Sequence, residues 1–322
     1  MNREACKREM NRLGNLNIPF CFLIDFEAQM PRLWRLDQKI QDYSLECNGR
    51  IFGPGYNFRA TDTSDFRFDK YPIDPETYRR MFNITIGHIQ KGYSYLVNLT
   101  SATKIVTDLS LQELFSMGKS RYKCMLEQQF VCFSPESFVQ IQEGRIRSFP
   151  MKGTIDASIP DAREKILSDQ KEAAEHATIV DLIRNDLGKV STEVRVDRYR
   201  YYEEITHASG RLGQVSSEIS GRLPPDYPGR IGDILFSLLP AGSISGAPKR
   251  RTVEIIQEAE GSPRGYYTGI AGYFDNGVLD SCVLIRFLEG GGIYRSGGGI
   301  TAASSMESEY QEMIEKIYVP IH

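Results

Sequence analysis

Apolar and polar positions follow two different periods along this chain. Continuous or alternating apolar runs of strand length occupy residues 18–25, 93–100, 122–133, 145–149, 189–198, 212–219, 267–274 and 278–288. Helical spacing occupies residues 75–91, 111–117, 160–187, 248–260 and 306–318. Because the strands come in groups with helices between the groups, the order predicts an α+β fold built on antiparallel sheets, not a strict βαβ alternation.

Turn and capping residues sharpen several of these boundaries. Asp74 followed by Pro75 is typical of a helix start, and Gly92 predicts the end of that helix. Asn276-Gly277 lies between two apolar runs and suits a tight reversing turn, so residues 267–288 are expected to form a hairpin.

Composition and charge narrow the class of protein. The chain has 322 residues, with 39 Lys and Arg against 42 Asp and Glu, and 41% of its residues are hydrophobic. At about 150 residues per domain, this length predicts roughly two domains. The near balance of charges argues against a nucleic-acid partner, which would need a basic field.

The cysteines and the N-terminus indicate the cellular compartment in which the protein is expected. Six cysteines are scattered without a close pair, which is typical of free thiols and not of a disulfide framework or a zinc site. The first 14 residues are charged and lack the apolar core of a signal peptide, and no apolar run is long enough to cross a membrane. We therefore expect a cytoplasmic protein that has no membrane partner.

Two predicted helices carry carboxylates three residues apart. Glu172 and Glu175 form one pair, and Glu309 and Glu312 form the other, so each pair projects from one helix face. Two such faces opposite each other would offer oxygen ligands that suit Mg²⁺. Solvated glutamate-rich faces are common, and the pattern alone leaves both interpretations open.

Three further segments could carry chemistry. The glycine loop at residues 242–249 leads into a helix and resembles an anion site, although a simple tight turn is equally compatible. Lys152 follows a strand and could be a surface charge or, if desolvated, a nucleophile. Glu136 could be a strand-end cap or a general acid.

Taken together, these segments resemble the chorismate-utilising enzymes, and among them most closely the aminodeoxychorismate synthase components I. The matching runs lie in the family's order from about residue 73 to residue 322. They are Ser134-Pro135-Glu136, Pro150-Met151-Lys152-Gly153-Thr154, the run 179–188, the loop 242–249, the run 267–274, Gly297-Gly298-Gly299-Ile300 and the Glu309/Glu312 pair.

The resemblance implies a fold and a division of the chain. It implies two packed lobes of largely antiparallel sheet with helices outside. Residues 1–72 would form an N-terminal strand and loop segment packed on the catalytic domain, and residues 73–322 would form the chorismate-binding catalytic domain. The chain would be a short form that lacks most of the N-terminal region of fuller-length relatives.

The resemblance also assigns site residues around chorismate, a dianion with two carboxylates. Glu175 and Glu312 match Mg²⁺ ligands, with Glu172 and Glu309 as supporting carboxylates. Arg286 and Tyr267 match groups that hold the enolpyruvyl carboxylate. Main-chain N–H groups around Ser245, Gly298 and Gly299 would complete that anion site, and Lys316 matches a lysine on the substrate side.

Two positions favour one reaction of the family over the others. Leu96 stands where isochorismate-forming members carry a lysine base, so addition of water is disfavoured. Lys152 stands where anthranilate synthases typically have alanine and aminodeoxychorismate synthases have lysine. The resemblance therefore implies that Lys152 attacks C2, that Glu136 protonates the leaving C4 hydroxyl, and that ammonia gives 4-amino-4-deoxychorismate, the precursor of 4-aminobenzoate and folate.

Departures from the family pattern keep alternatives open. Gln214 stands where many relatives have histidine, and Leu96 replaces the glutamine usual in amine-adding members. An anthranilate synthase component I and a non-catalytic chorismate-binding subunit therefore remain alternatives. The chain has no Gly-x-Cys-x-Gly nucleophile elbow, so nitrogen would come from free ammonia or from a separate glutamine amidotransferase subunit.

Overall fold

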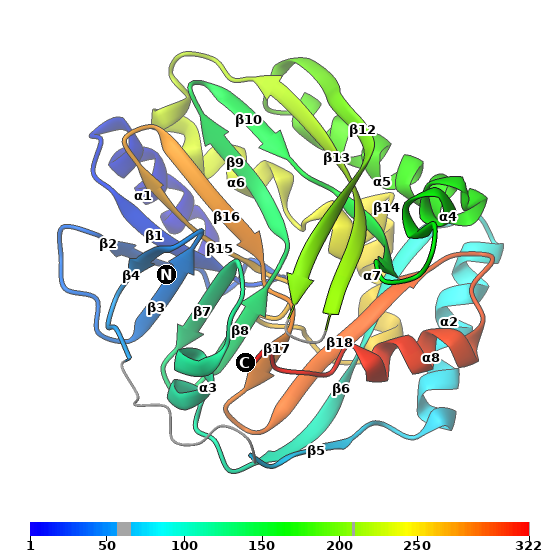
Figure 1. The fold of residues 1–322 in the computed structure, drawn as a ribbon. Coiled ribbons are helices and arrows are strands. Elements are labelled where there is room, and N and C mark those ends of the chain that lie inside the picture. The colour runs from blue at the N-terminus through cyan, green and yellow to red at the C-terminus, as the bar shows by residue number, and fades with distance from the viewer. Residues whose placement is uncertain (57–65, 208–209, 322) are drawn as a thin grey trace.

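A computed structural model describes residues 1–56, 66–207 and 210–321. Within these ranges the chain forms two nine-stranded sheets in which every paired strand is antiparallel, with helices on the outside (Figure 1). The predicted α+β class with two lobes of antiparallel sheet is confirmed.

The first sheet gathers strands from the start, middle and end of the chain. Its order is β11 (Met151–Asp156), β13 (Gly210–Arg222), β10 (Arg145–Ser148), β9 (Ser137–Gln142), β16 (Val278–Val283), β15 (Ile270–Asp275), β1 (Phe20–Ile24) and β2 (Arg32–Arg35). A long strand, β12 (Thr192–His207), pairs with β13 beside this path.

The second sheet also combines strands from the start, middle and end of the chain. Its order is β14 (Gly246–Ala247), β6 (Leu96–Thr107), β18 (Ile293–Ile300), β17 (Phe287–Glu289), β8 (Phe130–Ser134), β7 (Tyr122–Leu126), β3 (Tyr43–Cys47) and β4 (Arg50–Phe52), and β5 (Phe68–Tyr71) pairs with β6. Since β1 pairs with β15 and β3 pairs with β7, residues before position 73 contribute strands to both sheets.

Helices cover the outer faces of both sheets (Figure 1). They are α1 (Arg3–Asn15), α2 (Pro75–Gln90), α3 (Leu111–Met117), α4 (Ala162–Ser168), α5 (Gln170–Gly188), α6 (Ile231–Leu238), α7 (Lys249–Glu260) and α8 (Met306–Glu315). None of the helices in the described residues is long and apolar enough to cross a membrane.

Local signals predicted several elements correctly. Residues 111–117 form α3, and Ser110 and Glu113 complete its capping box. Asp74 caps α2 by accepting the Thr77 N–H at 2.9 Å. The turn at Asn276 and Gly277, both with positive φ, joins β15 to β16.

The long helix predicted over residues 160–187 is wrong in one respect. Asp169 has an extended backbone (φ −64°, ψ 114°) and separates α4 from α5. Its carboxylate accepts the backbone N–H of Glu172 at 3.0 Å, so it caps α5 in place of continuing one helix. This cap fixes the start of the helix that carries Glu172 and Glu175.

The charged N-terminus forms a helix that the strand-and-loop prediction missed. In α1, Cys6, Met10 and Leu13 are buried, so an apolar stripe lies under the charged residues. The helix packs closely on α6, because a Cβ added at Gly232 would lie 2.2 Å from the Lys7 carbonyl oxygen.

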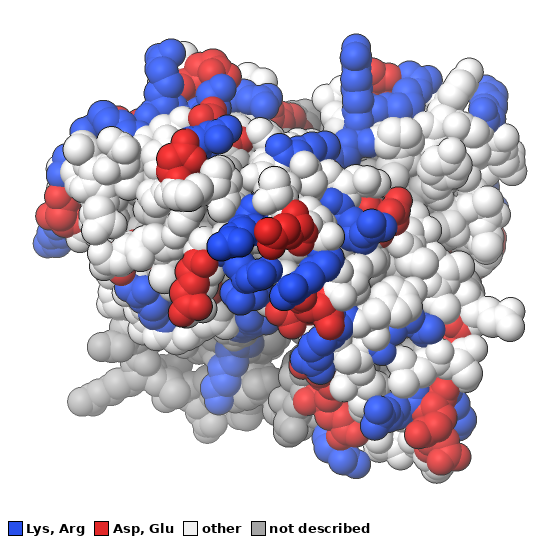
Figure 2. Space-filling model, turned by 90° about the horizontal axis from the view of Figure 1, so that it is seen from above, with Lys and Arg blue, Asp and Glu red and all other residues white. Residues whose placement is uncertain are grey.

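Charges of both signs share the side of the molecule formed by β10, β12 and β13. Figure 2 looks down on this side and shows Lys and Arg interspersed with Asp and Glu. Ion pairs join neighbouring residues of these strands, including Arg147 with Glu218 at 3.6 Å and Arg195 with Asp197 at 2.5 Å. This face therefore carries mixed charge and not a single-sign field.

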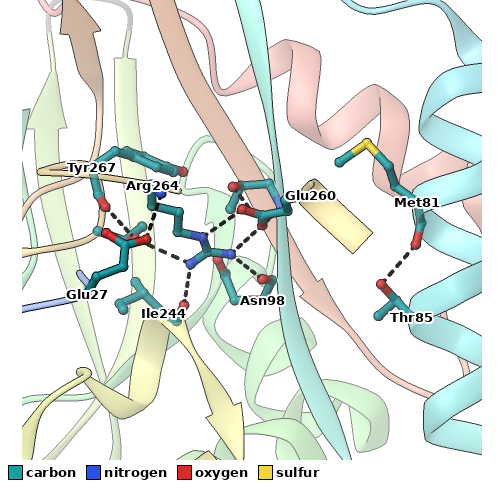
Figure 3. A network of polar contacts seen from close by, with 10 residues as sticks. Glu27, Met81, Thr85, Asn98, Ile244, Glu260, Arg264 and Tyr267 are labelled. Atoms are coloured by element: carbon teal, nitrogen blue, oxygen red, sulfur yellow. Dashed lines mark hydrogen bonds and ion pairs between the residues drawn. The ribbon is translucent and has the colours of Figure 1, made fainter. Parts of the chain in front are cut away.

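A buried ion pair connects a helix, a strand and a turn that are far apart in the chain (Figure 3). Arg264 and Glu260 have side chains that are only 1% and 4% exposed, and two N–H···O contacts of 2.5 and 2.9 Å connect them. The remaining guanidinium donors reach the carbonyl oxygens of Asn98 at 2.6 Å and Ile244 at 2.9 Å. The pair thus ties the end of α7 to β6 and to the turn η3 (Gly242–Ile244).

Both oxygens of the Glu260 carboxylate accept hydrogen bonds in this network. Its carboxylate also accepts the backbone N–H and the hydroxyl of Thr100, both at 2.9 Å. On the other side, Glu27 accepts the backbone N–H groups of Arg264 at 2.8 Å and Gly265 at 3.1 Å. Every charge in the cluster therefore has a partner, which is the condition under which a buried ion pair is tolerated.

Glu260→Gln is expected to destabilise the protein strongly. Removing one partner leaves the Arg264 cation buried without its counter-charge, which costs about 3–5 kcal/mol in free energy of unfolding. Denaturant unfolding measures this change.

The matched control is Glu254→Gln on the same helix, which breaks a half-exposed pair with Arg251 and should cost at most about 1 kcal/mol. Equal losses for the two variants would contradict the role given to Glu260.

Candidate active site

A cavity of about 610 Å³ lies where the two sheets and two helices meet. This volume is in the range of small-molecule sites. Its walls come from β6, β11 and β18, from the turn η3, and from α5 and α8. The lining includes Glu136, Lys152, Glu172, Tyr267, Arg286, Gly298, Gly299, Glu312 and Lys316, so most of the predicted site residues are brought together from distant parts of the chain.

One wall is an open strand edge. β17 pairs with β18 only from Ile293 to Arg295, whereas β6 pairs with β18 as far as Ile300. From Ser296 onward this edge of β18 therefore has no strand partner among the described residues, and residues 296–299 line the cavity. An edge of this kind leaves backbone polar groups available to a ligand.

Glycines allow the carboxylates to approach this edge. A Cβ added at Gly298 would lie 3.2 Å from a carboxylate oxygen of both Glu309 and Glu312. A Cβ at Gly153 would lie 3.0 Å from Glu172 Oε2. One glutamate of each pair, Glu172 from α5 and Glu312 from α8, therefore lines the same cavity.

Two lysines hold carboxylates of the two helices. Lys152 Nζ lies 2.7 Å from Glu175 Oε2, and Lys316 Nζ lies 2.5 Å from Glu312 Oε1. Lys316 also donates to the carbonyl oxygen of Gly297 at 3.0 Å. Glu309 is 7% exposed and accepts the Ser304 hydroxyl at 2.7 Å, so it is anchored to the loop before α8.

The residues present fit a magnesium ion in donor chemistry. Four carboxylates from α5 and α8 offer the oxygen ligands that Mg²⁺ prefers, beside a strand position that a side chain would obstruct. In the described ranges, no three side chains of His, Cys, Asp or Glu lie close enough together to hold a metal ion. Magnesium at Glu175 and Glu312, with Glu172 and Glu309 in support, stays a prediction.

Lys152 is not simply desolvated, as the nucleophile interpretation of its sequence position assumed, because carboxylates surround its amine. Burial lowers the pKa of its amine, but the hydrogen bond and charge of Glu175, with the charges of Glu172 and Glu312, outweigh it and raise the pKa overall. Lys152 is therefore an ammonium group when it pairs with Glu175.

Glu136 lies in the opposite electrostatic situation. Glu136 is partly buried at the cavity wall, and desolvation raises the pKa of its carboxyl group above the ordinary value. A hydrogen bond from the Ser243 hydroxyl and the positive charges of Arg286 and Lys316 oppose this increase without cancelling it. A carboxyl group with a raised pKa suits the role of a general acid.

Arg286 presents a partly buried cation to the cavity. Among the described residues, its guanidinium has no carboxylate partner, and its Nε has no hydrogen-bond partner. Tyrosine side chains surround it, including the buried Tyr267 and Tyr294. A partly buried guanidinium without a counter-charge is suited to a carboxylate ligand, which it can bind through two parallel hydrogen bonds.

Three residues of the sequence-based assignment, Ser245, Glu175 and Glu309, are not part of the cavity lining. Ser245 is fully buried, its hydroxyl donates to the Ala241 carbonyl at 2.8 Å, and its N–H points to Gly242. The loop continues as β14, which pairs with β6, and its backbone is used in the sheet instead of an open anion site. Gln214 lines a neighbouring cavity and not the one around Lys152.

Sequence reasoning missed the role of Ser243. This residue lies in the predicted loop, but its hydroxyl hydrogen bonds to Glu136, which is 107 positions away in the chain. Position in the glycine loop was the only local signal, and it did not identify the partner.

Comparison with known proteins identifies the family of this chain. Residues 31–322 match the family described as chorismate binding enzyme. An uncharacterised PabA-like protein of Pasteurella multocida is 47% identical over the full length of both chains. A second PabA-like protein, of Haemophilus influenzae, is 45% identical over 97% of this chain and 95% of its own.

Anthranilate synthases and isochorismate synthases are also similar. Component 1 of the Archaeoglobus fulgidus anthranilate synthase is 33% identical over 75% of this chain, but the match covers 61% of that protein. The structure of anthranilate synthase component I from Streptococcus pneumoniae has a TM-score of 0.66 at 29% identity, over 81% of this chain and 60% of that one. The putative isochorismate synthase of Bacillus anthracis shares the fold, with a TM-score of 0.73 at 20% identity over 98% and 86% of the two chains. The chain therefore belongs to the chorismate-binding enzyme family.

Proposed function

We propose that this protein is an aminodeoxychorismate synthase component I, which replaces the C4 hydroxyl of chorismate with ammonia. The observation that carries the proposal is that Lys152 and Glu136 line the same cavity. An amine and a carboxyl group with a raised pKa are the two groups that a covalent displacement with acid assistance requires.

Binding of the dianion follows from the charges on the walls. Arg286 is suited to the enolpyruvyl carboxylate, and the open edge of β18 at Gly298 and Gly299 offers backbone donors. Lys316 adds a second positive charge, although Glu312 shares it. Magnesium bound by Glu175 and Glu312 would neutralise the carboxylate charge that faces the substrate's ring carboxylate.

The proposed reaction has two displacements. The Lys152 ammonium passes a proton to its partner Glu175, and the resulting amine attacks C2, while the C4–O bond breaks and Glu136 protonates the departing hydroxyl, which leaves as water. Ammonia then attacks C4, the lysine–C2 bond breaks, and Lys152 is released. The balance is chorismate plus ammonia giving 4-amino-4-deoxychorismate plus water, with the enolpyruvyl group retained.

Leu96 supports amination over addition of water. Its side chain lines the cavity, is 5% exposed, and lies close to Gly299 on β18. An aliphatic group at this place can neither activate nor hydrogen bond a water molecule. Free ammonia or a separate glutamine amidotransferase subunit would supply the nitrogen.

An anthranilate synthase component I is the second candidate. The observation in its favour is the similarity to anthranilate synthase components, including 41% identity over 194 residues with that of Acetivibrio thermocellus. That match covers 57% of this chain and 38% of the relative. The two activities give different products from the same substrates, so product analysis separates them.

Lys152→Ala is expected to lose nearly all amination at C4, because the variant lacks the nucleophile. The assay incubates protein with chorismate, Mg²⁺ and ammonium, adds an aminodeoxychorismate lyase, and measures 4-aminobenzoate and anthranilate. Lys104→Ala, on the exposed part of β6, is the control and should keep wild-type activity.

Each alternative has its own result in this assay. Anthranilate from the wild-type protein would establish the second candidate. Chorismate binding without turnover at any ammonium concentration would indicate a non-catalytic subunit. Full amination by Lys152→Ala would show that the covalent step is wrong.

Glu136→Gln is expected to lower kcat by about 10²- to 10⁴-fold, the usual contribution of a general acid. In the wild-type protein, activity should fall as the pH rises through the raised pKa of Glu136, because the acid is then deprotonated. The residual activity of Glu136→Gln should lack this fall. A pH profile of kcat for both proteins makes the comparison, and identical profiles would exclude Glu136 as the acid.

Removal of magnesium is expected to abolish most of the thermal stabilisation by chorismate, because the glutamates then repel the dianion. Glu312→Gln should weaken stabilisation in the same way when magnesium is present. Glu307→Gln, an exposed position of the same helix, should not. Melting curves with chorismate, with and without a chelator, test all three.

A further inference from the structure

The chain after α8 is held in a fixed position beside the cavity. The buried hydroxyl of Tyr294 donates to the carbonyl oxygens of Tyr318 at 2.8 Å and Lys316 at 3.3 Å. The Lys119 N–H donates to the Pro320 carbonyl at 2.8 Å, and Ile321 forms a bridge with Gly118. The segment 316–321 is therefore fastened at several points along its backbone.

This segment places one aromatic ring against Arg286. The guanidinium carbon of Arg286 lies 5.0 Å from the centre of the Tyr318 ring, within the range of a cation–π contact. Tyr318 itself is 44% exposed, so this ring is not a core residue whose position burial alone would explain.

Arg286 and Tyr318 also form part of a wall between two cavities. A second cavity of about 750 Å³ shares Pro135, Glu136, Met151, Arg286 and Tyr318 with the candidate active site. Its other walls carry both carboxylates and cations, including Glu203, Glu218, Arg198 and Arg211. A guanidinium at the boundary of two cavities could turn to either one unless a neighbouring group held it.

We propose that Tyr318 is a positioning residue for substrate binding. Its ring packs against the Arg286 guanidinium and keeps that group directed to the substrate cavity, so that the cation is ready for the enolpyruvyl carboxylate. The inference rests on the proposed function in taking a chorismate carboxylate as the ligand of Arg286, and it adds a residue that the family motifs quoted above do not include.

The expected effect is on affinity and not on chemistry. Loss of a cation–π contact of this kind corresponds to about a two- to thirtyfold weaker binding. Because Tyr318 acts through Arg286 and away from Lys152, we expect KM for chorismate to rise while kcat changes little.

The experiment compares Tyr318→Ala and Tyr318→Phe with the wild-type protein. Chorismate binding is measured by calorimetry with Mg²⁺ and without ammonium, so that no amination product forms, and KM and kcat are then measured with ammonium. Tyr318→Ala should weaken binding within the range given, whereas Tyr318→Phe, which keeps the ring, should bind like the wild type. Tyr71→Ala, at an exposed tyrosine of β5, is the control for loss of a surface ring.

The outcomes separate this inference from the proposed function. Unchanged binding by Tyr318→Ala, equal loss in Tyr318→Ala and Tyr318→Phe, or a fall in kcat without a change in affinity would each overturn the positioning role. Failure of the wild-type protein to bind chorismate would instead contradict the proposed function. Anthranilate as the product would change the proposed reaction but leave the binding test valid.

Discussion

The buried ion pair between Arg264 and Glu260 is the interaction on which the candidate active site depends. The pair lies outside the cavity, yet it bonds to Asn98 and Ile244, two residues that line it. A guanidinium has several donors in one plane, so a single buried side chain can fix backbone segments from β6 and the turn η3 in one geometry. The cavity walls are therefore held from behind by a fully bonded charge pair, which leaves the residues that face the cavity available for chemistry.

The charged side chains that line the cavity are paired differently from those behind its wall. Behind the wall every charge has its partner, whereas Arg286 has no carboxylate partner among the described residues. The glutamates of α5 and α8 are shared with Lys152 and Lys316. The structure thus separates the fully bonded charges behind the wall from the charges that line the cavity. A dianion such as chorismate fits the second group, because it can pair with the cations while a divalent cation offsets the glutamates.

Local residue patterns predicted the elements that local interactions determine. The helix 111–117, the cap at Asp74 and the turn at Asn276-Gly277 depend on residues within a few positions of each other. The break at Asp169 was missed because an aspartate inside a helical pattern gives no sign of whether it continues the helix or caps a new one. Most of the cavity residues came from the family resemblance, while the bond from Ser243 to Glu136 and the packing of Tyr318 on Arg286 join positions far apart in the chain, for which no local pattern exists.

The open edge of β18 has a consequence for how this cavity can change during evolution. Every residue except proline carries a backbone N–H, so most substitutions leave these groups in place and can only obstruct them, as a side chain at Gly298 would. Under the proposed function, recognition of a carboxylate at this edge would be a property of the fold that related enzymes can share. New reactions must arise instead from the few side chains on the other walls, such as Leu96 and Lys152. A fold with a constant binding edge and variable facing positions can exchange one chemistry for another without losing its substrate.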